Sequence, residues 1–268
     1  MHWRDGQPIE RISVSDRSFQ YGDGCFTTIL TRDGKLQLWA QHVKRMEQAL
    51  EALRIEPVDW HALRDDIESL ALPDAQAGIK LHVSRGEGGR GYSAKVNHGP
   101  FVTVSCFEYP EKYNELRQNG VEMTVSDVVL GHSPLLAGLK HNNRLEQILA
   151  KSNVEDAGYL DGIVLDLEAN VIETTMANLF WVKSQQLFTA DLSLAGVSGV
   201  MREQVLEAMS SLGYSVTVGQ FRLETVLDAD EVFVTNCILG VAPVIKIREV
   251  EFVKGSLTKQ IQEKLSLC

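Results

Sequence analysis

The sequence has 268 residues, of which 44% are hydrophobic and 23% are charged, and its formal net charge is −10. Such a length suits one large domain or two ordinary ones, and the composition is typical of a globular protein. The acidic balance, with no basic stripe, argues against nucleic acid as a partner, and no apolar run is long enough to suggest a membrane span.

The first 112 residues predict one α/β domain. A strand is expected over 10–14, and a hairpin over 25–39 turns at Asp33-Gly34. Apolar residues at helical spacing predict a helix over 40–54, and Asp59 is placed to cap a second helix over 60–72. Strands over 79–84 and 101–107 complete this part.

After the last of these strands the composition changes, because Tyr109 to Tyr113 is polar and contains a proline. We therefore expect an N-terminal domain at 1–112, a linker at 113–120 and a C-terminal domain at 121–268. The fold class is α+β, with antiparallel or mixed sheets, and no GxGxxG follows a strand as a dinucleotide fold would require. In the second domain the patterns predict strands at 121–130, 179–182, 216–218 and 231–235, a hairpin of 162–167 with 171–174, and helices at 142–157 and 199–212.

The four cysteines, Cys25, Cys106, Cys237 and Cys268, form no CxxC pair, and no Cys/His cluster has the spacing of a zinc site. Free thiols in a reducing compartment are the expected state, and no metal site is predicted. The opening segment MHWRDGQPIE has no hydrophobic signal core, so the cytoplasm is the expected location.

Lys140 follows two apolar runs, 128–130 and 135–137, so partial burial of its side chain is expected. Burial lowers the pKa of an ammonium group, and a neutral amine can attack a carbonyl carbon. Glu173 stands near the end of a predicted strand, before Thr174 and Thr175, where a carboxylate could point into a pocket. A solvated lysine and an exposed strand carboxylate are the alternatives.

Three further stretches could bind anions. Arg45 lies one helical turn after His42, and its guanidinium could contact a phosphate or simply lie on the surface. A glycine turn at 196–199 opens a helix, whose free N–H groups and dipole favour an anion, and Cys237 follows a strand in a similar position. The loop 84–93 holds four glycines and two arginines but lacks the GK[ST] of a P-loop.

Together these stretches resemble the fold-type IV pyridoxal-phosphate enzymes, a family that includes branched-chain and D-amino acid aminotransferases and aminodeoxychorismate lyases. The segments 84–93 (SRGEGGRGYS) and 140–150 (KHNNRLEQILA) are most similar to the lyase branch, as is Cys25-Phe26-Thr27-Thr28 where many aminotransferases carry Phe-Glu-Gly. The landmarks follow the family order through nearly the whole chain: Ser15-Asp16-Arg17, Tyr21 to Phe26, His42 to Arg45, Lys140, Glu173 with Asn178, and Gly199 to Arg202.

The resemblance implies a role for each matching residue. Lys140 would hold pyridoxal 5′-phosphate covalently and then move a proton, and Glu173 would face the pyridine nitrogen. The phosphate would be bound by Arg45 and by the backbone of Val200 and Met201, with Asn178 and Cys237 also at the cofactor. Cys237 stands where relatives often carry threonine, so a backbone contact is expected there. Arg90, Tyr92 and Arg144 would bind the substrate carboxylates, and Thr28 would protonate the leaving group.

The implied activity is the conversion of 4-amino-4-deoxychorismate to 4-aminobenzoate and pyruvate, a step of folate biosynthesis, by a homodimer. Two alternatives stay open from the sequence. One is a branched-chain or D-amino acid aminotransferase of the same fold, which would need a second keto acid to complete its cycle. The other is a non-catalytic protein that binds the cofactor, although simple binding would not need both Lys140 and Glu173.

Overall fold

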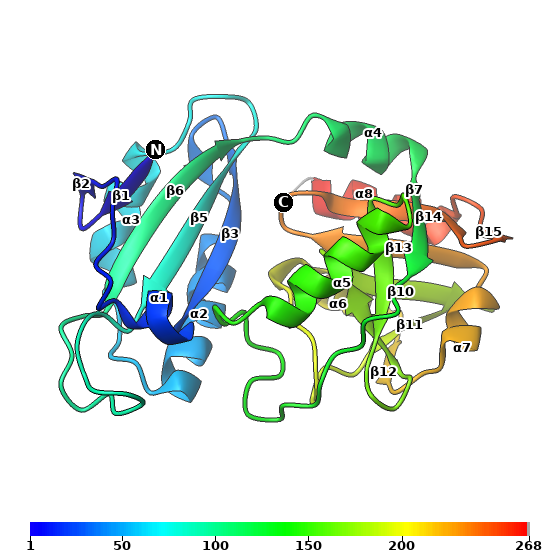
Figure 1. Ribbon diagram of the computed structural model, residues 1–268. Helices are drawn as coiled ribbons and strands as arrows, with labels where there is room; N and C mark the ends of the chain where they lie inside the picture. Colours follow the sequence, from blue (N-terminus) through cyan, green and yellow to red (C-terminus); the bar gives the residue numbers. More distant parts are fainter. Residues whose placement is uncertain (267–268) are drawn as a thin grey trace. The chain divides into compact units, whose positions relative to one another are not determined.

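The computed structural model describes residues 1–266, and the chain divides into two compact units (Figure 1). The first unit comprises Met1–Tyr109 and Leu139–Asn143, and the second comprises Pro110–Gly138 and the chain from Arg144 onward. None of the helices within residues 1–266 combines the length and the apolar character needed to cross a bilayer.

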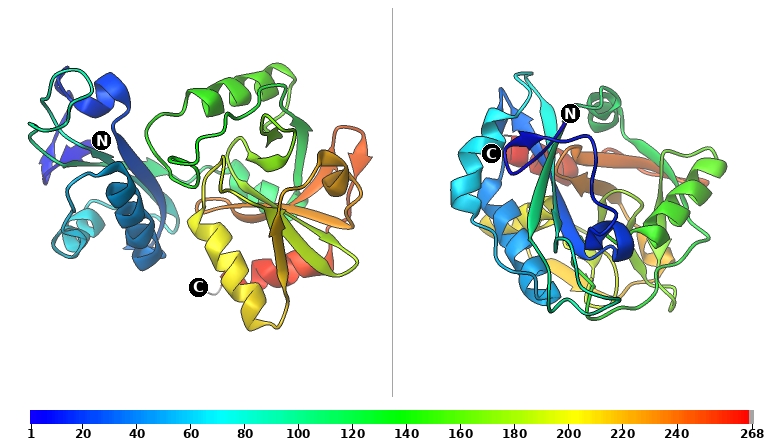
Figure 2. Two further views of the ribbon diagram at one scale, coloured as in Figure 1. Left: turned by 90° about the horizontal axis from the view of Figure 1, so that it is seen from below. Right: turned by 60° about the vertical axis from the view of Figure 1, so that its left-hand side comes forward.

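The first unit is a six-stranded sheet in which every pairing is antiparallel, in the order β2-β1-β6-β5-β3-β4. Helices α2 and α3 pack on one face of it (Figure 2). In the core between them, Ile29, Ile79 and Leu81 of the strands cluster with Met46 and Leu50 of α2. The predicted hairpin is confirmed, and so is the cap of α3, because the Asp59 carboxylate accepts from the Ala62 N–H at 3.0 Å. The elements are β1 (His2–Arg4), β2 (Gln7–Pro8), α1 (Arg17–Tyr21), β3 (Gly24–Arg32), β4 (Lys35–Leu36), α2 (Trp39–Leu53), α3 (Trp60–Ser69), β5 (Ala77–Ser84) and β6 (Phe101–Glu108).

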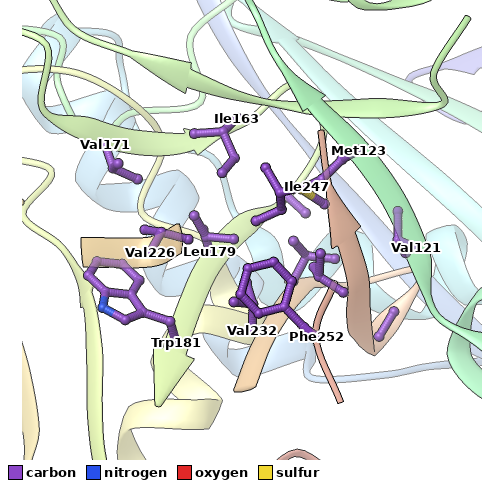
Figure 3. Close-up of a cluster of buried hydrophobic side chains, with 14 of the residues drawn as sticks. Val121, Met123, Ile163, Val171, Leu179, Trp181, Val226, Val232, Ile247 and Phe252 are labelled. Carbon is purple, nitrogen blue, oxygen red and sulfur yellow. The ribbon is translucent and has the colours of Figure 1, made fainter. Parts of the chain in front are cut away.

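The second unit is built on a nine-stranded mixed sheet, ordered β12-β11-β10-β13-β14-β7-β8-β9 with β15 beside β14. Helices α6 and α8 pack on the side of Phe180 and Phe233, whose rings stack at 5.1 Å. The opposite side encloses a second core around Leu179 and Trp181 (Figure 3). The elements are α4 (Lys112–Asn119), β7 (Val121–Val125), α5 (Leu145–Asp156), β8 (Asp161–Leu165), β9 (Val171–Thr174), β10 (Asn178–Lys183), β11 (Gln186–Ala190), α6 (Val200–Ser211), β12 (Val216–Gly219), α7 (Leu223–Leu227), β13 (Glu231–Asn236), β14 (Gly240–Ile247), β15 (Val250–Glu251) and α8 (Ser256–Ser266).

The structure confirms the α+β class with antiparallel and mixed sheets, but it differs from the sequence-based predictions at several points. Residues 113–120, expected as a linker, largely form α4, because Tyr113 and Leu116 pack on the core of the second unit. No strand forms at 10–14, where Ile12 and Val14 are exposed. Lys140, expected in the C-terminal domain, belongs to the first unit. Cys268 lies outside the described residues.

Candidate active site

Lys140 lies in a short segment that pairs with the beginning of β3. The Phe26 N–H donates to the Lys140 carbonyl oxygen at 2.9 Å, and the Asn142 N–H donates to the Gly24 carbonyl oxygen at 3.0 Å. Lys140 Nζ lies 4.7 Å from the centroid of the Phe26 ring, and the residue is half-buried. Strand pairing therefore fixes the backbone of the lysine, while its amine rests on an aromatic face in a cation–π contact.

A second amine shares this ring, because Lys80 Nζ of β5 lies 4.5 Å from the Phe26 centroid. In the β3–β5 pairing Thr28 is opposite Lys80 and Phe26 is opposite His82, so these four side chains share one face of the sheet. Burial lowers the pKa of Lys80, and burial together with the Lys80 charge lowers the pKa of His82 to about 4. The Thr28 hydroxyl thus stands beside a cationic, partly apolar surface.

Arg45 of α2 belongs to a buried polar chain on the other face of β3. Its Nη2 donates to Thr27 Oγ1, and Thr27 Oγ1 lies 2.6 Å from His42 Nδ1. Burial holds the pKa of His42 well below its ordinary value, and the Arg45 charge adds to this effect. The contact between α2 and β3 therefore holds one edge of the Arg45 guanidinium through a neutral hydroxyl.

Glu173 is a buried carboxylate on β9, with 6% of its surface exposed. Its Oε2 accepts from the Val197 N–H at 2.9 Å. An ionised carboxylate at such a depth needs donors around it, and the backbone at Val197 supplies one. Glu173 is thereby tied to the segment that leads into α6.

The segment 196–199 is held by backbone and amide bonds within the second unit. The Gly138 N–H donates to the Gly196 carbonyl at 3.0 Å, and the Ser198 N–H donates to the Gly138 carbonyl at 2.9 Å. Asn178 Nδ2 donates to the Val197 carbonyl at 2.8 Å. Gly199 is the N-cap of α6 and has no side chain to cap the helix.

Val200 and Met201 occupy the first turn of α6, where helix N–H groups have no acceptor within the helix. A Cβ on Gly199 would lie 2.2 Å from Asn178 Oδ1, so glycine keeps the amide of Asn178 in place. Cys237 lies in the turn after β13. The Asn236 side chain shapes this turn, because Asn236 Oδ1 accepts from the N–H groups of Ile238 and Leu239 at 2.9 and 2.8 Å.

The glycine-rich loop after β5 exposes both of its predicted substrate residues, Arg90 and Tyr92, and Tyr92 is 91% exposed. The loop is organised by the buried Arg17. Its guanidinium donates to the carbonyls of Gly88, Gly91, Tyr92 and Ser93, at 3.4, 3.2, 3.4 and 3.1 Å, and to the Asp23 carboxylate at 2.8 Å. The loop backbone is therefore shaped by a side chain far from it in the sequence.

The structure groups the predicted residues into two sets. Lys140, Thr28, Arg45, Arg90 and Tyr92 belong to the first unit. Glu173, Asn178, Val200, Met201, Cys237 and Arg144 belong to the second unit, where Arg144 is the half-buried N-cap of α5.

The sequence-based reasoning missed the roles of Thr27, Arg17 and Gly138, each of which supports another residue. For Thr27 a signal was present, since it alternates with Cys25 and Ile29 on the core side of a predicted strand. A hydroxyl at a core position needs a partner, and the histidine and arginine on the next helix could supply one.

These groups match the chemistry of pyridoxal phosphate, which carries an aldehyde, a pyridine nitrogen and a phosphate. Lys140 offers the amine and Glu173 the buried carboxylate, while Arg45 and the uncapped start of α6 offer donors for an anion. Within residues 1–266 no cluster of His, Cys, Asp and Glu side chains could hold a metal ion.

The chain is similar to proteins of known activity over its whole length. The model of the amino-transferase class IV family matches residues 24–247. An aminodeoxychorismate lyase of Vibrio harveyi is 49% identical, over 99% of this chain and 100% of that protein. The crystal structure of 4-amino-4-deoxychorismate lyase from Pseudomonas aeruginosa superposes with a TM-score of 0.92 at 36% identity, covering 99% of this chain and 98% of that one.

A branched-chain amino acid aminotransferase of Escherichia coli shares the fold alone, with a TM-score of 0.84 at 23% identity over 98% of this chain and 92% of that one. The family match covers most of the chain, and the similarity to the Vibrio lyase extends from end to end. The chain therefore belongs to the class IV aminotransferase family, whose enzymes depend on pyridoxal phosphate.

Proposed function

We propose that the protein is a pyridoxal-phosphate-dependent lyase that converts 4-amino-4-deoxychorismate to 4-aminobenzoate and pyruvate. The observation that carries this proposal is the 49% identity to the Vibrio harveyi lyase, which spans both chains. The likeness to the Pseudomonas aeruginosa lyase supports it. In this reaction the substrate loses the proton at C4 and the bond from C3 to the enolpyruvyl oxygen, so that the ring becomes aromatic.

Bound pyridoxal phosphate supplies an electron sink for the charge that develops at C4. Lys140 would hold the cofactor through its Nζ, and the same amine would take the proton from C4 of the substrate. Glu173 would face the pyridine nitrogen of the bound cofactor, where a negative charge would favour the protonated ring. The support for this role is its burial and its bond from the Val197 N–H, which fix the direction of the carboxylate.

The cofactor phosphate is bound by Arg45, by the N–H groups of Val200 and Met201, and by the backbone at Cys237. A guanidinium and a helix N-terminus are both strong phosphate binders. Asn178 supports the site by holding the Val197 carbonyl, which keeps the approach to α6 in place.

The substrate carries two carboxylates, and we assign them to Arg90, Tyr92 and Arg144. In an acidic protein, local arginines are needed to attract a dianion. Thr28 would give its hydroxyl proton to the enolpyruvyl oxygen as it leaves and would regain a proton from Lys140, which took one from C4. Such general acid assistance contributes about 10²–10⁴-fold to a rate.

The test is to supply 4-amino-4-deoxychorismate to the purified holoenzyme without any keto acid and to follow 4-aminobenzoate by fluorescence. Steady turnover is expected, and Lys140→Ala is expected to abolish it. No product from a yellow, borohydride-sensitive protein would instead favour the branched-chain or D-amino acid aminotransferase, which the fold shared with the Escherichia coli enzyme keeps as a second candidate. A protein that binds the cofactor and catalyses neither reaction would be the non-catalytic alternative.

The same proposal includes a homodimer. Leu145, Ile148 and Leu149 are 74%, 57% and 58% exposed, and their spacing gathers them on one face of α5. An apolar helix face of this kind is typical of an interface, and a second copy of the chain is the partner we propose. Ile148→Asp should shift the protein to monomer in sedimentation, whereas Val253→Asp, at another exposed apolar site, should leave the dimer intact.

The cytoplasm is the proposed location, with neither nucleic acid nor membrane as a partner. The net charge of −10 and the free thiols of Cys25 and Cys106 support this. Cell fractionation followed by detection of the protein would test it.

A further inference from the structure

Thr27 joins two polar side chains inside the first unit. It is 0% exposed and His42 is 1% exposed, so neither relies on water for its hydrogen bonds. Thr27 Oγ1 lies 2.6 Å from His42 Nδ1 and accepts a hydrogen bond from Arg45 Nη2. The three residues come from two elements, β3 and α2, that pack face to face in the core.

The direction of these hydrogen bonds follows from which of the three groups carry a proton to donate. A guanidinium can only donate, so the Thr27 oxygen must accept from Arg45. The Thr27 hydroxyl proton is then available for His42 Nδ1, which accepts it if the imidazole is neutral. Burial and the nearby Arg45 charge lower the pKa of His42 and keep that imidazole neutral. The chain therefore runs from the Arg45 guanidinium to the Thr27 hydroxyl, and from there to the His42 ring.

We propose that Thr27 and His42 are positioning residues that orient Arg45 for the phosphate of the cofactor. His42 aims the Thr27 hydroxyl, and the hydroxyl fixes one edge of the guanidinium. The inference rests on the phosphate role proposed above for Arg45.

Two physical consequences support this arrangement. An arginine side chain has many rotamers, and fixing it before the ligand arrives removes an entropic cost from binding. A hydroxyl is also a neutral acceptor, so it orients the guanidinium without cancelling its charge. A carboxylate at position 27 would orient Arg45 equally well but would compete with the phosphate for its charge.

The experiment compares two ligands of the apoenzyme, pyridoxal phosphate and pyridoxal, which lacks the phosphate. Dissociation constants are measured by absorbance titration for the wild type, Thr27→Val and Thr27→Ser. Thr27→Val keeps the shape and removes the hydroxyl, and we expect it to weaken pyridoxal phosphate about tenfold, in line with one hydrogen bond to a charged group. Thr27→Ser should restore the affinity, and all three proteins should bind pyridoxal equally.

A second pair of variants tests His42. Asn carries an acceptor near the position of Nδ1, whereas Leu carries none, so His42→Asn should retain most of the affinity for pyridoxal phosphate and His42→Leu should lose it. If Thr27→Val does not fold, judged by its melting curve, this pair decides the question. Equal affinity of folded Thr27→Val and wild type for pyridoxal phosphate would overturn the inference, as would equal losses for both ligands.

The titrations also separate this inference from the proposed function. A wild type that binds pyridoxal phosphate no more tightly than pyridoxal would overturn the phosphate role of Arg45 and the inference with it. A wild type that prefers pyridoxal phosphate, together with a Thr27→Val that keeps this preference, would leave the proposed function intact and refute only the positioning role.

Discussion

Each unit contains a group that we propose as a binder of the cofactor phosphate, but the two groups are held differently. In the first unit the group is the Arg45 guanidinium, held by the side chains of Thr27 and His42. In the second it is the start of α6, held by backbone bonds to Gly138 and by the Asn178 amide. A site made of side chains depends on residue identity at each position. A site made of backbone N–H groups depends on glycines, because a Cβ would prevent the close approach of the chain segments.

The glycine-rich loop of the first unit extends the comparison. One side chain helps to hold its path, because Arg17 donates to four of its carbonyl oxygens. In the second unit the segment 196–199 takes its path from a positive φ of 85° at Gly196 and from strand-like pairing with Gly138. A conservative change at Arg17 should therefore disturb the loop, and a Cβ added at Gly196 should disturb the segment 196–199.

The largest effect is expected for Gly196→Ala. An L-residue in the left-handed region costs about 1–2 kcal/mol. The new Cβ would also lie 2.6 Å from Ile172 Cγ2 and 2.9 Å from Leu192 Cδ2, and overpacking of this kind costs about 1–3 kcal/mol. We expect the free energy of unfolding to fall by about 3 kcal/mol in urea titrations.

Gly158→Ala is the matched control, because Gly158 lies in the same unit at a φ of 84° with no atom within 4 Å of the new Cβ. It should lose only the backbone cost, about 1–2 kcal/mol. Equal losses at the two positions would show that the tight surroundings of Gly196 do not matter.

Sequence patterns predicted local features well, because those features depend on neighbouring residues. The cap at Asp59 and the turn at Asp33-Gly34 both formed as expected. Strand β14 was missed, since it contains Pro243, and a proline normally argues against an inner strand. The strand expected at 10–14 failed because no other strand pairs with it, which its composition does not reveal.

The candidate residues also differ in whether local sequence or long-range contacts determine them. Lys140 and Glu173 could be singled out from their sequence context and from family resemblance. The placement of Lys140 beside β3 could not, because its pairing with Phe26 joins residues far apart in the chain. Thr27 was overlooked although its core position in a predicted strand was a signal, since its partners lie on the following helix. Local patterns thus singled out the candidate residues but not the residues that hold them.

A smaller effect is expected for Arg17→Lys, which tests whether the Arg17 guanidinium holds the glycine-rich loop. Lysine keeps the positive charge but has one nitrogen, so it cannot reach all the carbonyls that the guanidinium fork reaches. We expect faster amide hydrogen exchange across residues 88–93 and a loss of about 1–2 kcal/mol in unfolding free energy. Arg90→Lys, an exposed change on the same loop, should leave the exchange unaltered; unchanged exchange in Arg17→Lys would contradict the role of Arg17.

The smallest effect concerns pH and isolates His42. Its pKa in the folded protein lies well below the ordinary 6.5, so near pH 7.5 the ring is neutral in both the folded and the unfolded states. As the pH falls below 6.5, the unfolded chain takes up a proton that the folded chain refuses, and stability falls by up to about 1.4 kcal/mol per pH unit. His82, whose pKa is lowered to about 4, adds a loss of the same sign in both proteins.

His42→Asn cannot take up this proton, so its stability should fall less than that of the wild type between about pH 7.5 and pH 5.5. Urea unfolding at pH 7.5 and pH 5.5 gives the free energy of unfolding of both proteins. The wild type should lose about 1.4 kcal/mol more than His42→Asn, which is the linkage of one histidine over one pH unit. Subtracting the variant from the wild type removes the contributions of His82 and of Asp161, whose pKa is raised by burial. A constant difference would mean that the folded protein takes up a proton at His42 as readily as the unfolded chain does, so that the ring is mostly protonated at pH 5.5. Its Nδ1 would then be a donor, and the direction of the hydrogen bonds through Thr27 to Arg45 would have to be revised.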